Sequence, residues 1–467
     1  MWHLLYNMAL LIASPVILAV LLAKQRCRRG LPQRLGWEDG SSGLSRLFGF
    51  FEQEKLIKPD QPNRPNQPVI WIHAVSLGEV VAVTPLVKEL HRRHPEYRLV
   101  VSTVTETGRE AVEQRLAGVA DHCYAPLDFP WVVSRFIERL QPCLYVFVET
   151  ELWPNLLWQL RRHGVPTVLV NGRLSTRSFA RQQWAPVRSF YRTMLQPLSL
   201  CLMQSDRDVD RIIALGAEAS RVRRTGNIKF DQPMPEVTEG GLTRAQLGLQ
   251  DTERLFVAGS THPGEEEVLV ECYRAILAQC PSAVLLLAPR HIERAESVEE
   301  MIRARGFAVQ RRSTIGQAGP LRSSGPRVLV LDSRGELAVI YREALVAFVG
   351  GTLVPIGGHN LLEPALWAKP VLFGPYTDHC AEIADLLIQA GGGRRVLQAE
   401  DLIRQVLALF ADDEERERMG RSARQVVEEN QGALKRTLEA IDRLLTAQQG
   451  PSGSPLAGRS LPLMAGR

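Results

Sequence analysis

Glu79 is the first residue whose type and position could support catalysis. It ends the segment Trp71-Ile-His-Ala-Val-Ser-Leu-Gly-Glu79, in which an apolar run that predicts a strand gives way to a helical pattern. Gly78 at this turn would let a ligand approach the backbone closely, and the carboxylate of Glu79 could take a proton from an attacking hydroxyl. A carboxylate in the first turn of a helix is also favoured by the helix dipole, so a purely structural role stays open.

A second group of polar residues predicts a site for a phosphate or a nucleotide. Arg290 follows an apolar run in Ala288-Pro289-Arg290-His291, and its guanidinium could hold a phosphate through two parallel hydrogen bonds. Asp332-Ser-Arg-Gly-Glu336 opens a predicted helix, and a glycine-rich loop runs from Gly350 through Asn360 into Glu363. Amides of such a loop could bind the phosphate while Glu363 accepts hydrogen bonds from ribose hydroxyls. Alone, a glycine-rich turn is weak evidence, and Arg290 could be an ordinary surface arginine.

Two series of short apolar runs alternate with amphipathic helical stretches and would position these residues. The first series lies in residues 69–230 and the second in residues 242–447, where it ends in a helix predicted over 413–447; the linker 231–241 separates them. Each series predicts an α/β domain with a parallel, Rossmann-like sheet. Because such sheets bind ligands at the carboxyl ends of their strands, two facing sheets would form a central cleft lined by the loops named above.

The N-terminal segment predicts attachment to a membrane. Leu4 to Ala23 contains no charged residue over 20 positions, long enough to span a bilayer, and basic residues follow it at 24–29. We therefore expect a retained anchor over residues 1–24, with the later residues on the cytoplasmic side. Asn7 and Pro15 leave an anchor that lies in the membrane interface as an alternative. Residues 25–68 are expected to form a juxtamembrane linker, and residues 448–467 a disordered tail.

The overall composition narrows the function further. The 467 residues carry a net charge of +5, with arginines spread along the chain, which does not indicate a nucleic-acid-binding protein. Seven widely spaced cysteines without a CxxC pair indicate a reducing compartment and no structural zinc. The chain has no P-loop, no dinucleotide-binding GxGxxG and no HExxH motif, and we expect no cofactor. Arginines at 177, 181, 188 and 192 could steer an anionic lipid, although such a helical face is more often simply solvated.

Seven ordered blocks give the chain a resemblance to the Kdo (3-deoxy-D-manno-octulosonic acid) transferases of lipopolysaccharide assembly. The resemblance extends from the N-terminal segment to about residue 440. The blocks are WIHAVSLGE (71–79), FVETELWPN (147–155), NGRLS (171–175), GNIKFD (226–231), APRH (288–291), RGEL (334–337) and FVGGTLVPIGGHNLLEP (348–364).

This resemblance implies a GT-B architecture and an inverting, metal-independent transfer of Kdo from CMP-Kdo to a lipid A precursor, lipid IVA, at the cytoplasmic face of the cell inner membrane. It makes Glu79 the catalytic base. It places CMP contacts at Pro289, Arg290, Arg334, Gly335, Glu336, Asn360, Leu361, Leu362 and Glu363. Glu149 and Glu151 would support the base, and Lys229 could meet the carboxylate of the donor.

The sequence also departs from the family pattern, and two other interpretations stay open. Glu106 and Ile292 stand where proline is common, and residues 311–326 look like a loop insertion. Another GT-B enzyme that acts on a different nucleotide sugar, a transferase or an epimerase, would share these sheets and would be distinguished by competition between CMP and UDP. A non-catalytic, anchored lipid-binding protein would bind lipid without releasing sugar.

Overall fold

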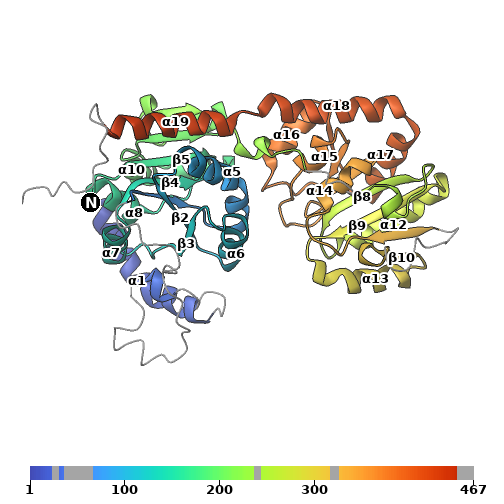
Figure 1. Cartoon of the computed structure of the whole chain (residues 1–467), viewed down its shortest axis with the longest axis horizontal. Helices are drawn as coiled ribbons and strands as arrows, with labels where there is room; N and C mark the ends of the chain where they lie inside the picture. Colours follow the sequence, from blue (N-terminus) through green and yellow to red (C-terminus); the bar gives the residue numbers. More distant parts are fainter. Residues whose placement is uncertain (24–30, 36–66, 236–242, 316–325, 450–467) are drawn as a thin grey trace, which may run out of the picture. The chain divides into compact units, whose positions relative to one another are not determined.

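The computed structural model describes residues 1–23, 31–35, 67–235, 243–315 and 326–449 (Figure 1). The chain divides into two compact units. Unit 1 comprises Met1–Gln232 and Gln431–Arg467, and unit 2 comprises Pro233–Asn430. Most of the predicted linkers at 25–68 and 231–241, the core of the predicted insertion at 311–326, and the tail at 450–467 lie outside the described residues.

Unit 1 is built on a seven-stranded, wholly parallel sheet. The strand order is β3-β2-β1-β4-β5-β6-β7, so the chain changes direction across the sheet between β1 and β4. The strands are β1 (Val69–His73), β2 (Arg98–Thr103), β3 (Asp121–Tyr124), β4 (Pro142–Val148), β5 (Thr167–Gly172), β6 (Leu200–Met203) and β7 (Val222–Arg224). The predicted parallel α/β sheet is confirmed.

Helices cover both faces of this sheet because its strands are apolar on both sides. In β1, Ile70 and Ile72 pack into the core under α5, α6 and α19, whereas Val69 and Trp71 pack under α7, α8, α10 and α11. The helices of unit 1 are α1 (Trp2–Ala23), α3 (Leu31–Arg34), α5 (Leu77–Arg93), α6 (Glu106–Arg115), α7 (Pro130–Leu140), α8 (Pro154–Arg162), α9 (Thr176–Gln182), α10 (Ala185–Leu195), α11 (Asp206–Ala214) and α19 (Ala433–Gln449).

Unit 2 repeats the architecture with a second parallel, seven-stranded sheet. Its order is β10-β11-β9-β8-β12-β13-β14, and the change of direction lies between β8 and β12. The strands are β8 (Arg254–Thr261), β9 (Ala283–Pro289), β10 (Ala308–Arg311), β11 (Arg327–Val330), β12 (Val346–Val349), β13 (Val371–Phe373) and β14 (Gly393–Arg395). The helices are α12 (Glu265–Gln279), α13 (Ala295–Ala304), α14 (Leu337–Ile340), α15 (Leu362–Leu366), α16 (Ala381–Gln389), α17 (Ala399–Ala411) and α18 (Asp413–Asn430).

The single C-terminal helix predicted over residues 413–447 is wrong. The segment forms α18 in unit 2 and α19 in unit 1, separated by a break at which Gly432 adopts a φ of 89°. A residue with a side chain rarely takes this backbone conformation, which ends α18 and redirects the chain. Asp231 accepts hydrogen bonds from the backbone N–H groups of Gly432 and Leu434, both at 2.6 Å, and thereby caps the start of α19.

The predicted membrane anchor is not supported. Within the residues that the structure describes, no helix combines the length and the apolar character needed to cross a membrane. The first turns of α1 instead lie against unit 1 (Figure 1). Tyr6 donates a hydrogen bond to Asp128 at 2.8 Å, and Asn7 donates one to the side chain of Asn155 at 3.1 Å. The polar residues near the start of the apolar segment are therefore used in contacts with protein.

Candidate active site

In unit 1, the predicted base lies where the chain changes direction across the sheet. Glu79 follows β1, and Glu149 and Glu151 follow the neighbouring strand β4. Because both strands are parallel, their carboxyl ends meet at the same edge. This is the position at which open α/β sheets bind ligands.

Glu79 is held by the turn that precedes its own helix. Only 9% of the residue is exposed, and its two carboxylate oxygens accept hydrogen bonds from the backbone N–H of Val75 at 2.8 Å and from the hydroxyl of Ser76 at 3.1 Å. These bonds resemble a capping box, except that the backbone N–H belongs to Val75 and not to the N-cap residue Ser76. Glu79 therefore does have the structural role at the helix start that the sequence left open. The two bonds also fix the orientation of the carboxylate.

The surroundings of Glu79 favour proton transfer near neutral pH. Burial and, to a smaller extent, the negative charges of Glu149 and Glu151 raise the pKa of Glu79 to about 7, although the hydrogen bond from Val75 opposes them. Burial and the charge of Glu149 also raise the pKa of Glu151. A general base works best when its pKa lies near the working pH, and Glu79 meets that condition.

Glu149 contributes a second unusual feature to this edge. It adopts a φ of 55°, in the left-handed region that a non-glycine residue rarely occupies, and Asn171 at the end of β5 does so as well with a φ of 54°. Such strain concentrates at functional sites. Lys229 lies with its Nζ 3.4 Å from Oε1 of Glu149, an ion pair that was not expected from the sequence, which assigned Lys229 to the carboxylate of the donor.

Two further sequence blocks meet at the same edge. The side chain of Asn171, from NGRLS, accepts a hydrogen bond from the backbone N–H of Ile228, in GNIKFD, at 3.0 Å. Gln204 donates to the backbone carbonyl of Asn171 and accepts a hydrogen bond from Asn227. This buried network fixes the segment that carries Lys229.

Asp206 and Asp208 have the spacing of an acidic pair that could hold a metal, and they open α11 directly after β6. Both carboxylates are already engaged. Asp208 accepts a hydrogen bond from the backbone N–H of Leu174 at 2.8 Å, and Asp206 pairs with Arg224 at 3.2 Å. Among the described residues, no group of three or more histidine, cysteine or acidic side chains could hold a metal ion.

In unit 2, the predicted donor residues and His262 follow four neighbouring strands. The segment at 288–291 ends β9, 332–336 follows β11, His262 follows β8, and the loop from Gly350 follows β12. These segments therefore lie at one edge of the sheet, around its change of direction. The structure brings the predicted donor residues together at one edge.

Arg290 and Glu363 form the electrostatic centre of this edge. Arg290 is exposed, and its guanidinium makes no ion pair or side-chain hydrogen bond with any residue that the structure describes. Burial raises the pKa of Glu363, whereas a hydrogen bond from Asn360 at 3.2 Å and the charge of Arg290 lower it. The guanidinium of Arg290 could therefore bind a phosphate, while the carboxyl group of Glu363, which Asn360 orients, could accept hydrogen bonds from hydroxyl groups.

The other predicted donor residues differ in what they can offer. Leu361 and Leu362 are fully buried, so only their main-chain groups could meet a ligand. Arg334 is exposed and pairs with Glu293 at 3.0 Å. Glu336 accepts hydrogen bonds from Ser333 and Arg312. Pro289 is buried at the end of β9, and Gly335 adopts a φ of 84° between Arg334 and Glu336.

The prediction that the amides of the glycine-rich loop bind a phosphate is wrong for the first amides of the loop, because they already donate to a carboxylate of the protein. The backbone N–H groups of Gly351, Thr352 and Leu353 all donate to the carboxylate of Glu265, at 2.7, 2.9 and 2.9 Å, and that of His262 donates at 3.0 Å. Glu265 is completely buried, so the protein's own carboxylate occupies this nest of amides. The helix that follows the loop, α15, has only five residues.

The segment Gly259-Ser-Thr-His262 was expected to belong to the phosphate site, but its pairing with a second histidine beside Arg290 was not predicted. His262 and His359 share a hydrogen bond of 2.7 Å between their Nε2 atoms, and their rings stack with centroids 5.0 Å apart. Burial lowers the pKa of both rings, that of His359 to about 4, so both are neutral near pH 7. His262 directly follows β8, whereas His359 stands late in the glycine-rich loop after β12, and neither belongs to a motif with metal or catalytic spacing.

Comparison with known proteins assigns the chain to a family. A family model described as 3-Deoxy-D-manno-octulosonic-acid transferase (kdotransferase) matches residues 44–232. A 3-deoxy-D-manno-octulosonic acid transferase of Haemophilus influenzae is 35% identical over 446 residues, which cover 94% of this chain and 98% of the relative. The chain belongs to this family of transferases. The corresponding enzyme of Bordetella pertussis is 35% identical over 385 residues, 80% of this chain and 86% of the relative.

Solved structures agree with the two-sheet architecture. A putative UDP-N-acetylglucosamine 2-epimerase from Listeria monocytogenes superposes with a TM-score of 0.56, covering 82% of this chain and 98% of the other at 14% identity. A glycosyltransferase from Rickettsia africae gives a TM-score of 0.52, covering 81% and 99% at 13% identity. At such identities the likeness concerns the fold alone, which is of the GT-B type.

Proposed function

We propose that this transferase moves Kdo from CMP-Kdo to the lipid A precursor lipid IVA in lipopolysaccharide assembly. Family membership over nearly the whole length of the Haemophilus influenzae enzyme supports the sugar and the reaction. The observation that carries the mechanism is the position of Glu79, a buried carboxylate with a pKa of about 7 at the point where the unit 1 sheet changes direction.

Glu79 is the general base in this proposal. Its carboxylate takes the proton from a hydroxyl of the lipid acceptor while the hydroxyl oxygen forms a bond to the anomeric carbon of Kdo. The bond from that carbon to the phosphate oxygen breaks at the same time, through a state with oxocarbenium character, and CMP leaves with the bonding electrons. One base is sufficient because a phosphate needs no protonation to leave.

The edge of the unit 2 sheet holds the donor in this proposal. Arg290 meets the phosphate with a guanidinium that no described carboxylate pairs with, and Glu363 accepts hydrogen bonds from the ribose hydroxyls. Because the amides of residues 351–353 are bound to Glu265, the charge of the leaving phosphate falls mainly on Arg290. The pair His262 and His359 lies close enough to Arg290 for its charge to lower the pKa of both rings, and it supplies polar ring nitrogens at this edge.

We extend the proposal to stereochemistry and location. A single displacement at the anomeric carbon inverts its configuration, and Arg290 takes the place that a metal ion would otherwise have at the phosphate. The enzyme works at the cytoplasmic side of the cell inner membrane. Support comes from α1, whose outward face exposes Leu4, Met8, Leu11 and Ile12 by 60% or more, a surface suited to the membrane interface rather than to water.

Variants of Glu79 test the proposal. Glu79→Gln keeps one oxygen that can accept the hydrogen bond from the backbone N–H of Val75, and its NH2 group can donate to the hydroxyl oxygen of Ser76, but it cannot take a proton; Glu79→Ala removes both functions. We expect both to lower the rate of CMP release from CMP-Kdo in the presence of lipid acceptor by about 10²–10⁴-fold. Glu110→Gln, which changes an exposed carboxylate of the same unit, should release CMP at the wild-type rate. Near wild-type turnover in Glu79→Gln would refute the assignment of the base.

A further inference from the structure

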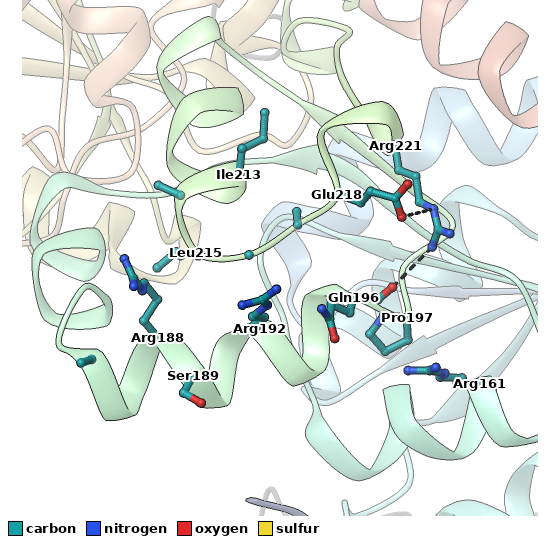
Figure 2. Close-up of a pocket in the computed structure, with 14 residues that line it drawn as sticks. Arg161, Arg188, Ser189, Arg192, Gln196, Pro197, Ile213, Leu215, Glu218 and Arg221 are labelled. Carbon is teal, nitrogen blue, oxygen red and sulfur yellow. Dashed lines mark hydrogen bonds and ion pairs between the residues drawn. The ribbon is translucent and has the colours of Figure 1, made fainter.

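Unit 1 contains a pocket that the transfer reaction does not use. It has a volume of about 870 Å³ and lies between α10, the end of α11 and the end of α8 (Figure 2). Pocket-lining segments directly precede β6 and β7, so the pocket lies toward the amino-terminal edge of the sheet. Glu79 and Glu149 follow the carboxyl ends of their strands, at the opposite edge. The two sites are therefore separate.

Four arginines line this pocket, and three of them have no counter-charge. Arg221 pairs with Glu218 at 3.0 Å and donates to the backbone carbonyl of Leu198 at 3.2 Å. Arg161, Arg188 and Arg192 make no ion pair or side-chain hydrogen bond with any residue in the described part of the chain. Glu218 is the one acidic residue among the described lining residues, and Arg221 already uses it.

The local packing fixes where Arg188 and Arg192 stand on the backbone, and their side chains are exposed. Arg188 and Arg192 stand one turn apart on the same face of α10 and point toward the loop at 213–218, as Figure 2 shows. Gly216 in that loop adopts a φ of 113°, and a Cβ atom there would lie 2.8 Å from the Cβ of Arg192 and 3.1 Å from its Cα. Only glycine permits this approach, which makes the loop and α10 two walls of one pocket.

Three arginines collected in a concavity without an acidic partner repel one another and attract an anion. The planar guanidinium forms paired hydrogen bonds with phosphoryl oxygens more readily than the point charge of a lysine does. The chemistry of the pocket therefore indicates a phosphoryl group.

The surroundings of the pocket indicate where this phosphoryl group comes from. Ser189, which lines the pocket, accepts a hydrogen bond of 3.0 Å from the indole of Trp2, so α1 lies beside it. The outward face of α1 exposes large apolar side chains, and Trp184, immediately before α10, is 69% exposed. Cations next to exposed leucines and a tryptophan are typical of a surface that binds an anionic bilayer.

We propose that the pocket lined by Arg161, Arg188 and Arg192 binds the phosphoryl headgroup of an anionic phospholipid at the membrane surface, as a site distinct from the one that holds the reacting groups. The proposal does not rest on the transfer reaction, since it concerns only how unit 1 meets the lipid surface. A headgroup bound there would fix the orientation of unit 1 on the membrane.

Vesicle sedimentation with the full chain tests this proposal. The probes are vesicles of phosphatidylcholine alone and vesicles that also contain phosphatidylglycerol. Arg188→Gln combined with Arg192→Gln should weaken binding to the phosphatidylglycerol vesicles about thirtyfold, because each of the two arginines near an anionic surface contributes on the order of 1 kcal/mol. Arg115→Gln combined with Arg135→Gln removes the same charge from exposed positions of α6 and α7 and should weaken binding much less.

The remaining outcomes separate the possible sources of the phosphoryl group. An equal loss of vesicle binding in both double variants would show that net charge alone drives binding and would contradict the proposed headgroup site. Calorimetric titration with inorganic phosphate gives the second arm. If the pocket variant loses phosphate binding but keeps vesicle binding, the pocket takes a soluble anion and the lipid assignment is wrong. Unchanged thermal unfolding of both double variants confirms that the exposed substitutions leave the fold intact.

Discussion

Glu79 combines a structural and a chemical role in one carboxylate. Its hydrogen bonds with Val75 and Ser76 hold it at the start of α5, and its burial beside two other acids holds its pKa near 7. Neither role excludes the other, since the bonds that orient a base also limit how far its pKa can rise. A carboxylate that only capped a helix would sit in solvent with an ordinary pKa.

The pH dependence of the reaction follows from this pKa. Glu79 acts as a base only when ionised, and the raised pKa means that protonation removes the active form as the pH falls below about 7. We expect kcat/KM for the lipid acceptor to decrease roughly tenfold per pH unit below that value. A profile measured from about pH 5 to pH 8 checks this. An acidic limb centred near the ordinary value for glutamate would contradict the environment described for Glu79.

At the residue scale, the sequence placed Glu79 and Arg290 at strand ends because each follows an apolar run, and it placed Glu363 at the end of a glycine-rich loop. It did not predict that Glu265 fills the amide nest of the glycine-rich loop. Glu265 stands in a run of three glutamates at a helix start, where all three look like exposed partners of the helix dipole. Glu265 and Glu266 are both completely buried, and what Glu265 binds is a loop 86 positions later in the chain.

At the scale of elements, Glu265 joins α12 to the loop after β12. Each oxygen of its carboxylate accepts two backbone N–H bonds, from His262 and Gly351 on one side and from Thr352 and Leu353 on the other. Burial raises the pKa of Glu265, and the four amide donors oppose that effect. The loop that leads to Asn360 and Glu363 therefore depends on one buried side chain.

Glu265→Gln tests this dependence. The amide nitrogen of glutamine would face two backbone N–H groups and leave them without an acceptor, which should destabilise unit 2 by about 2–4 kcal/mol. Glu267→Gln is the matched control, because Glu267 accepts a single bond from the backbone N–H of Gly264 that glutamine can still accept. Urea unfolding compares the two variants. Equal stability of both would show that the four amides do not require a full carboxylate.

The strands that the sequence did not reveal share a physical character. β7, β10 and β14 have three or four residues each, carry arginines, and lie at the ends of their sheets. An edge strand is covered less than a central one, so its side chains show no apolar run. The inner strands, buried on both faces, appear in the sequence as the runs from which the two sheets were predicted.

At the scale of the whole molecule, the C-terminal helix α19 is part of unit 1, although α18, which directly precedes it in the sequence, is part of unit 2. Leu438, Ile441 and Leu445 of α19 are at most 2% exposed and pack into the same core as Val80 and Leu90 of α5. His94 and Arg93 add hydrogen bonds to Asp442 at 2.7 and 2.9 Å. No local pattern in the sequence distinguishes this helix from α18.

A chain that ends at residue 430 should therefore lose the fold of unit 1 and keep that of unit 2. Burial of each large apolar side chain of α19 contributes about 1.5–3 kcal/mol, and three of them together approach the stability of a whole domain. Limited proteolysis with mass analysis of the fragments checks this, with a chain ending at residue 447 as the control. Protection of residues 67–232 in the shorter chain, equal to that in the control, would contradict the assignment of α19.

The proposed transfer of Kdo by this chain to a lipid is tested most directly by the mass of the acceptor lipid. Purified protein is incubated with CMP-Kdo and lipid IVA, and the lipid is analysed by mass spectrometry; a parallel reaction contains UDP-N-acetylglucosamine as the donor. We predict that the lipid gains the mass of one or more Kdo residues with CMP-Kdo and is unchanged with the UDP-sugar. An unmodified lipid with CMP-Kdo, or a sugar added from the UDP donor, would contradict the proposed function.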